Sequence, residues 1–496
     1  MKYIQGKEFD NKNGVFNYII GENQSSFYVL RLGKKGSGVQ NNVEKYNKST
    51  FQLEWVKDVS FEKDLGDKIP SGEAFLQSYA ILSKGKIYFI ISILETRKNM
   101  RSVYAKTISA DNGQAIGTAK LLAKEENFKA TEKFSVSFSP DSSSVLIKSG
   151  FVPSERRGAT TTFITAPFTC YKSVKLVKLD GYTDVFTKEM PLSDANGDLG
   201  ITSVSTDNNG NLLCIYTHVV KEKDMFGTSA IKGTKPGIGK IPASPDSKFI
   251  PFDLNVGVND HAYLFTNNLQ YDKNLNYAVI TGIFIDVPCK GKKNCERKEG
   301  TFFMKIDLNQ SKIITKQHYY FDEKLHQYYK DLFDRMDDYE RLTTVTSVID
   351  KQNEDVYTIS WGYRETILVT RFTKDGQLVW CKPLPRGIVT YKNGFGYAVK
   401  NGKFYMIYTD VPKNMELDIN NFSVSKIKTQ ASASGANVVA VSIDNTGKAE
   451  QKIIRTFDKG AANFNPETID NLLEQPPLYN LKNRDKEQFI RLEIGQ

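Results

Sequence analysis

The chain has 496 residues, of which 40% are hydrophobic and 25% charged, and its 67 Lys and Arg against 57 Asp and Glu give a formal net charge of +10. No run approaches the roughly 18 apolar residues that a membrane-spanning helix needs, which excludes an integral membrane protein of that type. Five cysteines are too few for a disulfide framework. The length suits two or three ordinary domains or one closed array of repeats, and we favour the array.

An alternating apolar strand recurs seven times along the chain. Its last apolar residue falls at Leu32, Ile108, Leu179, Phe252, Ile306, Phe372 and Ile443. These positions lie 54 to 76 residues apart, and several of the strands run into an Asp or Gly turn and a second strand. Stacked four-stranded modules produce this pattern. The sequence therefore predicts seven modules in one domain, at about 11–60, 76–123, 132–191, 201–257, 261–320, 344–384 and 395–456.

The third module shows the expected order of strands and turns. Residues 134–138 alternate apolar and polar side chains, a turn follows at 139–142, and strands at 145–147, 174–179 and 185–190 complete a sheet. The Ser139-Pro140-Asp141 turn and the Thr-Asp-Asn-Asn-Gly turn at 206–210 resemble the hairpins of Tol-type and WD-repeat β-propellers. The Trp-Asp signature is missing and the period is longer, so the resemblance covers the superfamily and no specific family. The resemblance implies a β-propeller and, with the seven modules counted above, we expect an all-β, seven-bladed β-propeller with four-stranded blades.

The two ends of the chain predict how such a ring closes. The first module shows only three strands, near 15–20, 27–32 and 51–59, while the last apolar strand, at 489–494, has no module of its own. Pairing of N- and C-terminal strands would remove the exposed sheet edge, so we expect the segment 457–496 to close the first blade. Residues 322–342 have the periodicity of one inserted amphipathic helix, which carries Asp334, Asp337, Asp338 and Glu340 outside its apolar stripe.

Positive charge concentrates in the connections between the second and third strands of the predicted blades. Five such segments, at about 95–102, 150–173, 220–248, 287–300 and 411–435, together hold 20 Lys and Arg against 9 Asp and Glu. Gathered on one face, these charges would attract an acidic partner and speed its association, although loops that are merely solvated would give the same count. The candidate binding residues are Arg97, Lys98, Arg101, Arg156, Arg157, Lys232, Lys235, Lys240, Lys290, Lys292, Lys293, Arg297 and Lys298.

Cysteines and the N-terminus bear on the compartment. Cys289 and Cys295 flank a basic loop and are close enough in sequence for a local disulfide, which would indicate an oxidising environment. Cys170, Cys214 and Cys381 lie in or beside strands and are interpreted as buried thiols. The first seven residues lack the apolar core of a signal peptide, so the protein is cytoplasmic if Met1 is its native start. The disulfide and the envelope location of similar propellers favour an extracytoplasmic protein, in the periplasm or at the cell surface.

No motif specifies a reaction, a metal or a cofactor. The segment 233–240 is similar to a phosphate-binding loop, but its spacing is wrong by one residue and Ile241 replaces the required hydroxyl. Asp194, Asn196 and Asp198 have the spacing of a calcium loop, but Leu199 stands where the turn glycine belongs, which favours a polar turn. The histidines at 218, 261, 318 and 326 lack metal-binding spacing. We expect no cofactor and no metal, and catalytic residues stay unknown.

Three functions are compatible with these patterns. The first, which we favour, is a non-enzymatic binding or scaffold propeller whose basic loops dock an acidic protein or a polyanionic glycan. The alternative is a carbohydrate-active enzyme, a glycoside hydrolase or lyase, with carboxylates at the central channel. A third is a structural subunit of a cell-envelope complex whose long loops are ordered by neighbours. The basic loops are poor in the interleaved aromatic residues that stack bases, which argues against nucleic acid as the partner.

Overall fold

The computed structural model places most of the chain in antiparallel sheet. The described residues are 2–10, 13–32, 41–59, 61–65, 74–126, 134–151, 170–191, 193–194, 197–223, 229–244, 246–252, 262–265, 270–271, 276–286, 298–325, 343–362, 366–387, 395–430, 435–457, 463–465, 478–483 and 486–493. They form eight consecutive sheets, numbered here as blades 1 to 8, in a chain that divides into two compact units. One unit spans residues 11–252 and the other holds residues 1–10, 253–467 and 475–496.

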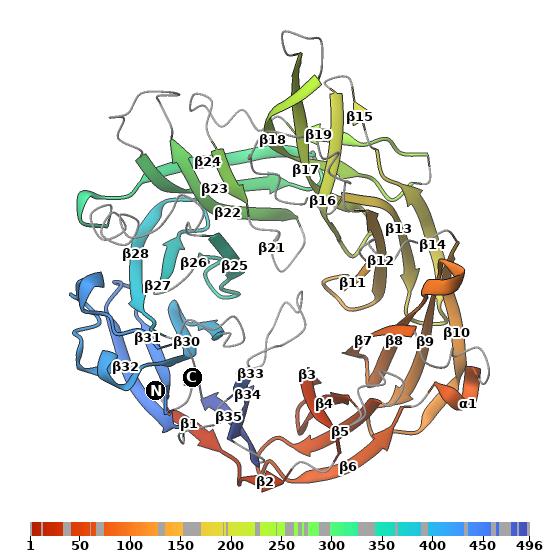
Figure 1. The fold of residues 1–496 in the computed structure, drawn as a ribbon, viewed down its shortest axis with the longest axis horizontal. Coiled ribbons are helices and arrows are strands. Elements are labelled where there is room, and N and C mark those ends of the chain that lie inside the picture. Colours follow the sequence, from red (N-terminus) through yellow and green to blue (C-terminus); the bar gives the residue numbers. More distant parts are fainter. Residues whose placement is uncertain are drawn as a thin grey trace. The chain divides into compact units, whose positions relative to one another are not determined.

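The first unit contains blades 1 to 4 (Figure 1). Blade 1 consists of β3 (Val15–Glu22), β4 (Ser26–Leu32), β5 (Asn41–Asn47) and β6 (Leu53–Asp58). Blade 2 consists of β7 (Ala74–Ser83), β8 (Lys86–Glu95), β9 (Met100–Ser109) and β10 (Ala115–Glu125). Blade 3 consists of β11 (Phe134–Phe138), β12 (Ser144–Phe151), β13 (Cys170–Lys178) and β14 (Thr183–Glu189). Blade 4 consists of β15 (Ser193–Asp194), β16 (Gly197–Thr206), β17 (Leu212–Lys223), β18 (Ser229–Ile241) and β19 (Ile250–Phe252).

The second unit contains blades 5 to 8. Blade 5 consists of β20 (Ala262–Phe265), β21 (Gln270–Tyr271), β22 (Tyr277–Asp286), β23 (Lys298–Asp307) and β24 (Lys312–Tyr320). Blade 6 consists of β25 (Thr343–Ile349), β26 (Val356–Gly362), β27 (Thr366–Phe372) and β28 (Leu378–Pro385). Blade 7 consists of β29 (Phe395–Lys400), β30 (Lys403–Asp410), β31 (Asn437–Ile443) and β32 (Ala449–Thr456). Blade 8 combines β33 (Asn463–Asn465), β34 (Leu478–Asn483) and β35 (Lys486–Glu493) with β1 (Lys2–Gln5) and β2 (Phe9–Asp10).

The chain is thus an all-β propeller of eight blades, and the prediction of seven is wrong. The C-terminal segment forms blade 8, in which β35 pairs with β34 on one side and with β1 and β2 on the other. The terminal strands do pair, from Lys2 opposite Glu493 to Gln5 opposite Ile490. They pair within an eighth blade, however, and do not complete the first one. Blade 1 needs no such completion because it has four strands of its own.

The missing strand of blade 1 is β5, which hydrophobic alternation could not reveal. Its sequence, Asn-Asn-Val-Glu-Lys-Tyr-Asn, holds only two apolar side chains. Glu44 is nevertheless buried, because it accepts a short hydrogen bond from the guanidinium of Arg31 on β4 and a 2.7 Å bond from the hydroxyl of Tyr46. A buried charge that is paired in this way is compatible with a blade interior.

Helical structure is limited to short segments among the described residues. They are α1 (Glu62–Leu65), the 3-10 turns η2 (Thr96–Lys98), η3 (Pro412–Glu416) and η4 (Val424–Lys426), and a turn at 323–325. Of the helix expected at 322–342, only residues 322–325 are described; one helical turn begins at Glu323, and the Asp322 carboxylate accepts the Leu325 N–H at 2.7 Å. Residues 326–342 lie outside the described residues. No helix in the described part of the chain is both long and apolar enough to span a membrane.

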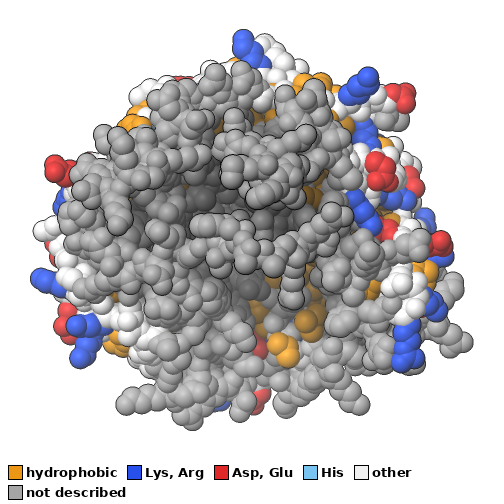
Figure 2. All heavy atoms as spheres, turned by 45° about the horizontal axis from the view of Figure 1, so that its top comes forward, with side chains coloured by type: hydrophobic (Ala, Val, Ile, Leu, Met, Phe, Trp, Pro, Cys, Tyr) orange, Lys and Arg blue, Asp and Glu red, His pale blue; other side chains and the backbone are white. Residues whose placement is uncertain are grey.

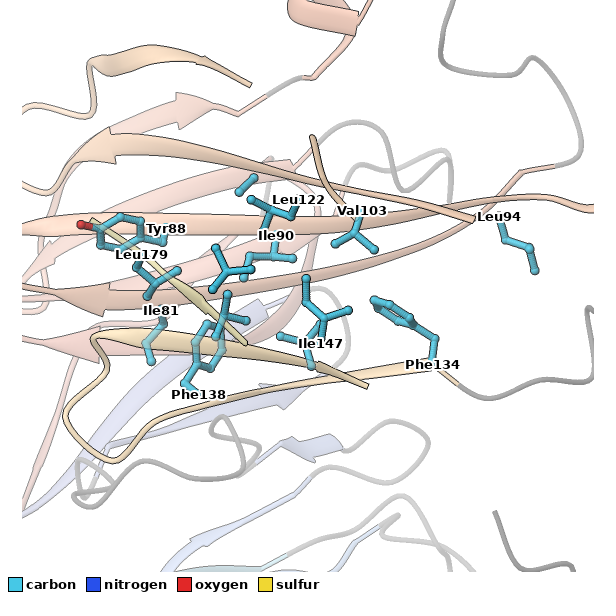
Figure 3. Packing of buried hydrophobic residues seen from close by; sticks show 14 residues of the cluster. Ile81, Tyr88, Ile90, Leu94, Val103, Leu122, Phe134, Phe138, Ile147 and Leu179 are labelled. Atoms are coloured by element: carbon cyan, nitrogen blue, oxygen red, sulfur yellow. The ribbon is translucent and has the colours of Figure 1, made fainter. Parts of the chain in front are cut away.

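The core lies between neighbouring blades, because both faces of the inner strands are covered. In β8, all eight residues between the two terminal ones are buried, whereas the outer strand β10 is mostly exposed. Blades 2 and 3 share a cluster that includes Ile81, Ile90, Val103, Phe138, Ile147 and Leu179 (Figure 3). A comparable cluster joins each further pair of consecutive blades within a unit. Removal of this apolar surface from water is the main force that holds one blade to the next.

The turns that prompted the propeller prediction have the expected Asp-centred geometry. The Asp207 carboxylate accepts the backbone N–H groups of Asn209 and Asn211, at 2.9 and 2.8 Å. Gly210 in the same turn has a φ of +82°, a conformation that L side chains rarely adopt. The Asn208 side chain also accepts the backbone N–H of Asp141 at 3.0 Å, so the turns of blades 3 and 4 support each other.

Candidate functional site

The five basic segments all join the second long strand of a blade to the third. They follow β8, β12, β17, β22 and β30 in blades 2, 3, 4, 5 and 7. The segment at 220–248 is mostly strand, because β17 runs to Lys223 and β18 starts at Ser229. Lys232, Lys235 and Lys240 therefore belong to β18 and not to a loop.

The connection from β8 to β9 is a basic segment whose exposed side chains are described. It consists of η2 and Asn99, which has a φ of +48°, and it exposes both Arg97 and Lys98. The Lys98 ammonium lies 2.6 Å from the Glu95 carboxylate, and its side chain stays 70% exposed. An exposed pair of this kind contributes little to stability, so it costs little to rearrange when a partner binds.

Arg101, predicted as a surface residue, is instead buried. Its guanidinium carbon lies 4.6 Å from the centre of the Phe134 ring of blade 3, a cation–π contact between blades. On the neighbouring strand Glu125 stands opposite Arg101, and its carboxylate accepts a short hydrogen bond from the Ser149 hydroxyl of blade 3. Phe134 itself belongs to the hydrophobic cluster that Figure 3 shows between the two blades. Arg101 therefore joins blades and does not face a partner.

The remaining predicted residues are placed only in part. Lys240 is 8% exposed and stands opposite Leu213 in the β17–β18 ladder. For Lys232, Lys235 and Lys298 the backbone is described, as part of β18 and β23. The positions that lie outside the described residues are Arg156, Arg157, Lys290, Lys292, Lys293, Arg297, Cys289 and Cys295. The loop disulfide stays a prediction.

A polar site that the charge count missed lies at the end of β30. One oxygen of the buried Asp410 carboxylate accepts three hydrogen bonds, from the backbone N–H groups of Gly387 and Val411 at 2.7 Å and from the Asn414 amide at 2.8 Å. Asn414 in turn donates to the Lys428 carbonyl at 3.0 Å and accepts the Lys428 N–H at 2.8 Å. We call residues 411–430 the strap; its first turn and its last residues are thus tied to one carboxylate.

Burial controls the electrostatics of this site. Desolvation raises the pKa of Asp410 to about 6, although its three N–H donors and the Arg386 guanidinium oppose the shift. Desolvation likewise lowers the pKa of Arg386 to about 10, while the charges of Asp410 and Tyr408 oppose that change. Arg386 is 1% exposed and immediately follows β28 of blade 6. The sequence signal for this site is weak: an Asp that ends an apolar strand, with an Asn four residues later.

The middle of the strap is bound at the opposite end of blade 7. The Asn420 amide donates to the Ala449 carbonyl and accepts the Ala449 N–H, both at 2.9 Å, in the manner of a neighbouring strand. Lys382 of β28 donates to the same Asn420 oxygen at 2.9 Å, and Lys324 donates to Asn421 at 3.4 Å. Because Asp410 pairs with Asn437 at the start of β31 and Ala449 begins β32, the strap follows the length of the blade.

The thiols and histidines form no site among the described residues. Cys170 and Cys214 are buried, as expected, and Cys381 is intermediate. Burial raises the pKa of the Cys214 thiol to about 12, so it is inert. His318 stands on β24, where its ring meets the edge of Phe284 at 5.4 Å. Within the described residues, no group of three or more His, Cys, Asp or Glu could hold a metal ion.

Charges of both signs are visible among the described side chains. In Figure 2, Lys and Arg side chains and Asp and Glu side chains both lie along the left and right edges of this face. Blue and red groups alternate there with exposed hydrophobic side chains.

The sheet order defines the chain as a β-propeller. It is similar to the Dos1 propeller, at 9% identity and a TM-score of 0.47, over 100% of this chain and 96% of that one. It is also similar to the β-propeller domain of the Trilobed protease from Pyrococcus furiosus, at 10% identity and 0.37, over 89% and 96%. A third match, prolyl oligopeptidase B from Galerina marginata, has 10% identity and 0.41, over 95% and 55%. No family model and no curated protein matches the sequence.

Proposed function

We propose that the protein is a binding propeller that docks a polyanion, either an acidic protein surface or an acidic glycan, through the basic connections that follow the second strands of its blades. The observation that carries this proposal is the charge count: these five segments hold an excess of +11, while the whole chain carries +10. Their common position in the blade topology supports it. Among the described residues of these segments, the exposed basic side chains are Arg97, Lys98, Lys248, Lys413, Lys426 and Lys428.

The test is charge reversal in the densest segment, with a matched control. The variant carries K290E, K292E, K293E and R297E. The control reverses four exposed lysines elsewhere in the blades, Lys120 and Lys312 on the outer strands β10 and β24, Lys178 at the end of β13 and Lys403 at the start of β30. Both sets change the net charge equally. Long-range attraction would fall in both, but only the first set would remove contacts, so its affinity should fall at least tenfold more.

Two immobilised probes separate the sources of negative charge: a sulfated glycan and an acidic protein of similar net charge. If only the variant binds a probe more weakly, docking is supported and that probe identifies the partner class. If variant and control lose the same affinity, or if neither loses any, the proposed docking surface is refuted. Release of shortened saccharides from the glycan would instead favour the enzymatic alternative.

A further inference from the structure

The strap is attached at two places that differ in chemistry. Its middle is held by the neutral amide of Asn420 against Ala449, together with the ammonium of Lys382. Its two ends are held by Asp410, directly at Val411 and Asn414 and, through Asn414, at Lys428. Three apolar side chains, Val411, Ile419 and Ile427, are buried along it. A change at Asp410 therefore acts on both ends of the strap at once.

The site around Asp410 leaves no room for local adjustment. A Cβ on Gly387 would lie 1.9 Å from the Lys428 carbonyl oxygen and 2.7 Å from the Asn414 amide nitrogen. The Gln430 N–H donates to the Gly387 carbonyl at 2.6 Å, so the last residue of the strap lies directly on this glycine. Close packing of backbone on backbone makes the closed strap one defined state, which must open as a unit.

The charged group that acts on Asp410 is Arg386, in the segment after β28. The Tyr408 hydroxyl, on the same strand as Asp410, acts in turn on Arg386. On the strap side, Asn414 is neutral and the Lys413 and Lys428 side chains are exposed. Arg386 is therefore the one cation among the described groups that acts on the pKa of Asp410.

We propose that residues 411–430 form a proton-controlled latch, closed most firmly when Asp410 is protonated and loosened when it ionises. The strap contains the exposed Lys413, Lys426 and Lys428, so its release would change how one basic segment of the chain is presented. The latch is independent of polyanion docking and holds if docking fails.

The size of the effect follows from linkage. In the closed state burial raises the pKa of Asp410 to about 6, and in the opened state the pKa returns to the ordinary value of 3.8. The closed state then binds more protons between these values, so opening becomes easier as pH rises through this window and is constant above it. Between pH 5 and pH 7.5 the opening equilibrium should increase about tenfold.

Amide hydrogen exchange of the full chain measures this directly, after correction for the intrinsic pH dependence. The reporters are the N–H groups of Gly387, Val411, Lys428 and Gln430, and the β31 ladder at Val439 is the internal reference. We expect opening at the reporters to rise about tenfold from pH 5 to pH 7.5 while the reference stays unchanged. A flat or falling profile would overturn the latch.

Two variants distinguish the effect of Asp410 ionisation from the effect of the other strap contacts. D410N keeps an oxygen acceptor but cannot ionise, so its opening should lose the pH dependence. N420A removes the neutral attachment in the middle and should open more at every pH, with the tenfold pH dependence retained. A D410N profile that still follows the wild-type pH dependence would refute the assignment to Asp410. If D410N fails to fold, the wild-type and N420A profiles decide the question together.

Discussion

Deletion of one carboxylate in blade 6 offers the sharpest test of how the blades are held together. Asp355 lies 2.5 Å from Nη2 and 3.0 Å from Nε of Arg371, whose Nη1 donates to the Asn445 carbonyl of blade 7 at 2.7 Å. The two side chains are only 11% and 9% exposed. D355A leaves a buried guanidinium without its counter-charge, which should cost about 3–5 kcal/mol of stability.

Removal of the arginine charge as well should restore much of that loss. We expect D355A/R371M to be more stable than D355A by about 2 kcal/mol, because no uncompensated charge then remains inside. Local opening free energies from amide exchange in β26 and β27 measure both variants without requiring a single unfolding transition. As control, K86A removes the exposed Lys86–Asp180 pair, whose atoms are 3.4 Å apart, and should change stability by about 0–1 kcal/mol. A D355A cost as small as that of K86A, or a double variant no better than D355A, would refute the reasoning.

Three further outcomes are expected. G387A should raise strap opening at every pH, since its Cβ would lie 1.9 Å from the Lys428 carbonyl oxygen; exchange at Gln430 checks this. F134A removes a buried ring beneath the Arg101 guanidinium and should destabilise blades 2 and 3 by about 3–5 kcal/mol, measured by exchange in β8 and β12. Burial raises the pKa of Cys214 to about 12, so at pH 8 this thiol should resist alkylation until the protein is denatured, as mass spectrometry of labelled peptides would show.

Sequence periodicity predicted the class of fold and most strands, because buried strands carry alternating or continuous apolar residues. It failed where the interior is polar. The strand at 41–47 is held by Glu44 and Arg31, so it gives no hydrophobic signal, and one blade therefore looked incomplete. That error led to a second one. The strand at 486–493 was predicted to complete blade 1, so the sequence did not predict blade 8.

The basic residues of the candidate site could likewise be predicted only in part from the sequence. A count of basic residues located the connections between second and third strands correctly but could not tell an exposed charge from a buried one. Arg97 and Lys98 are exposed, whereas Arg101 and Lys240 are buried within or between sheets. Strand pairing places both of these residues in a ladder, Arg101 opposite Glu125 and Lys240 opposite Leu213.

Buried arginines in this fold connect strands or blades. Substitutions of buried arginines therefore test stability, whereas substitutions of exposed basic residues test binding. Arg31 with Glu44 joins strands within blade 1, and Arg371 extends from Asp355 in its own blade to a carbonyl of the next. Substitution of such a residue lowers stability and therefore any activity, whatever the partner is. Only exposed basic residues such as Arg97 can report on docking with stability preserved. R97E should therefore weaken polyanion binding at unchanged thermal stability, while R101E should lower both.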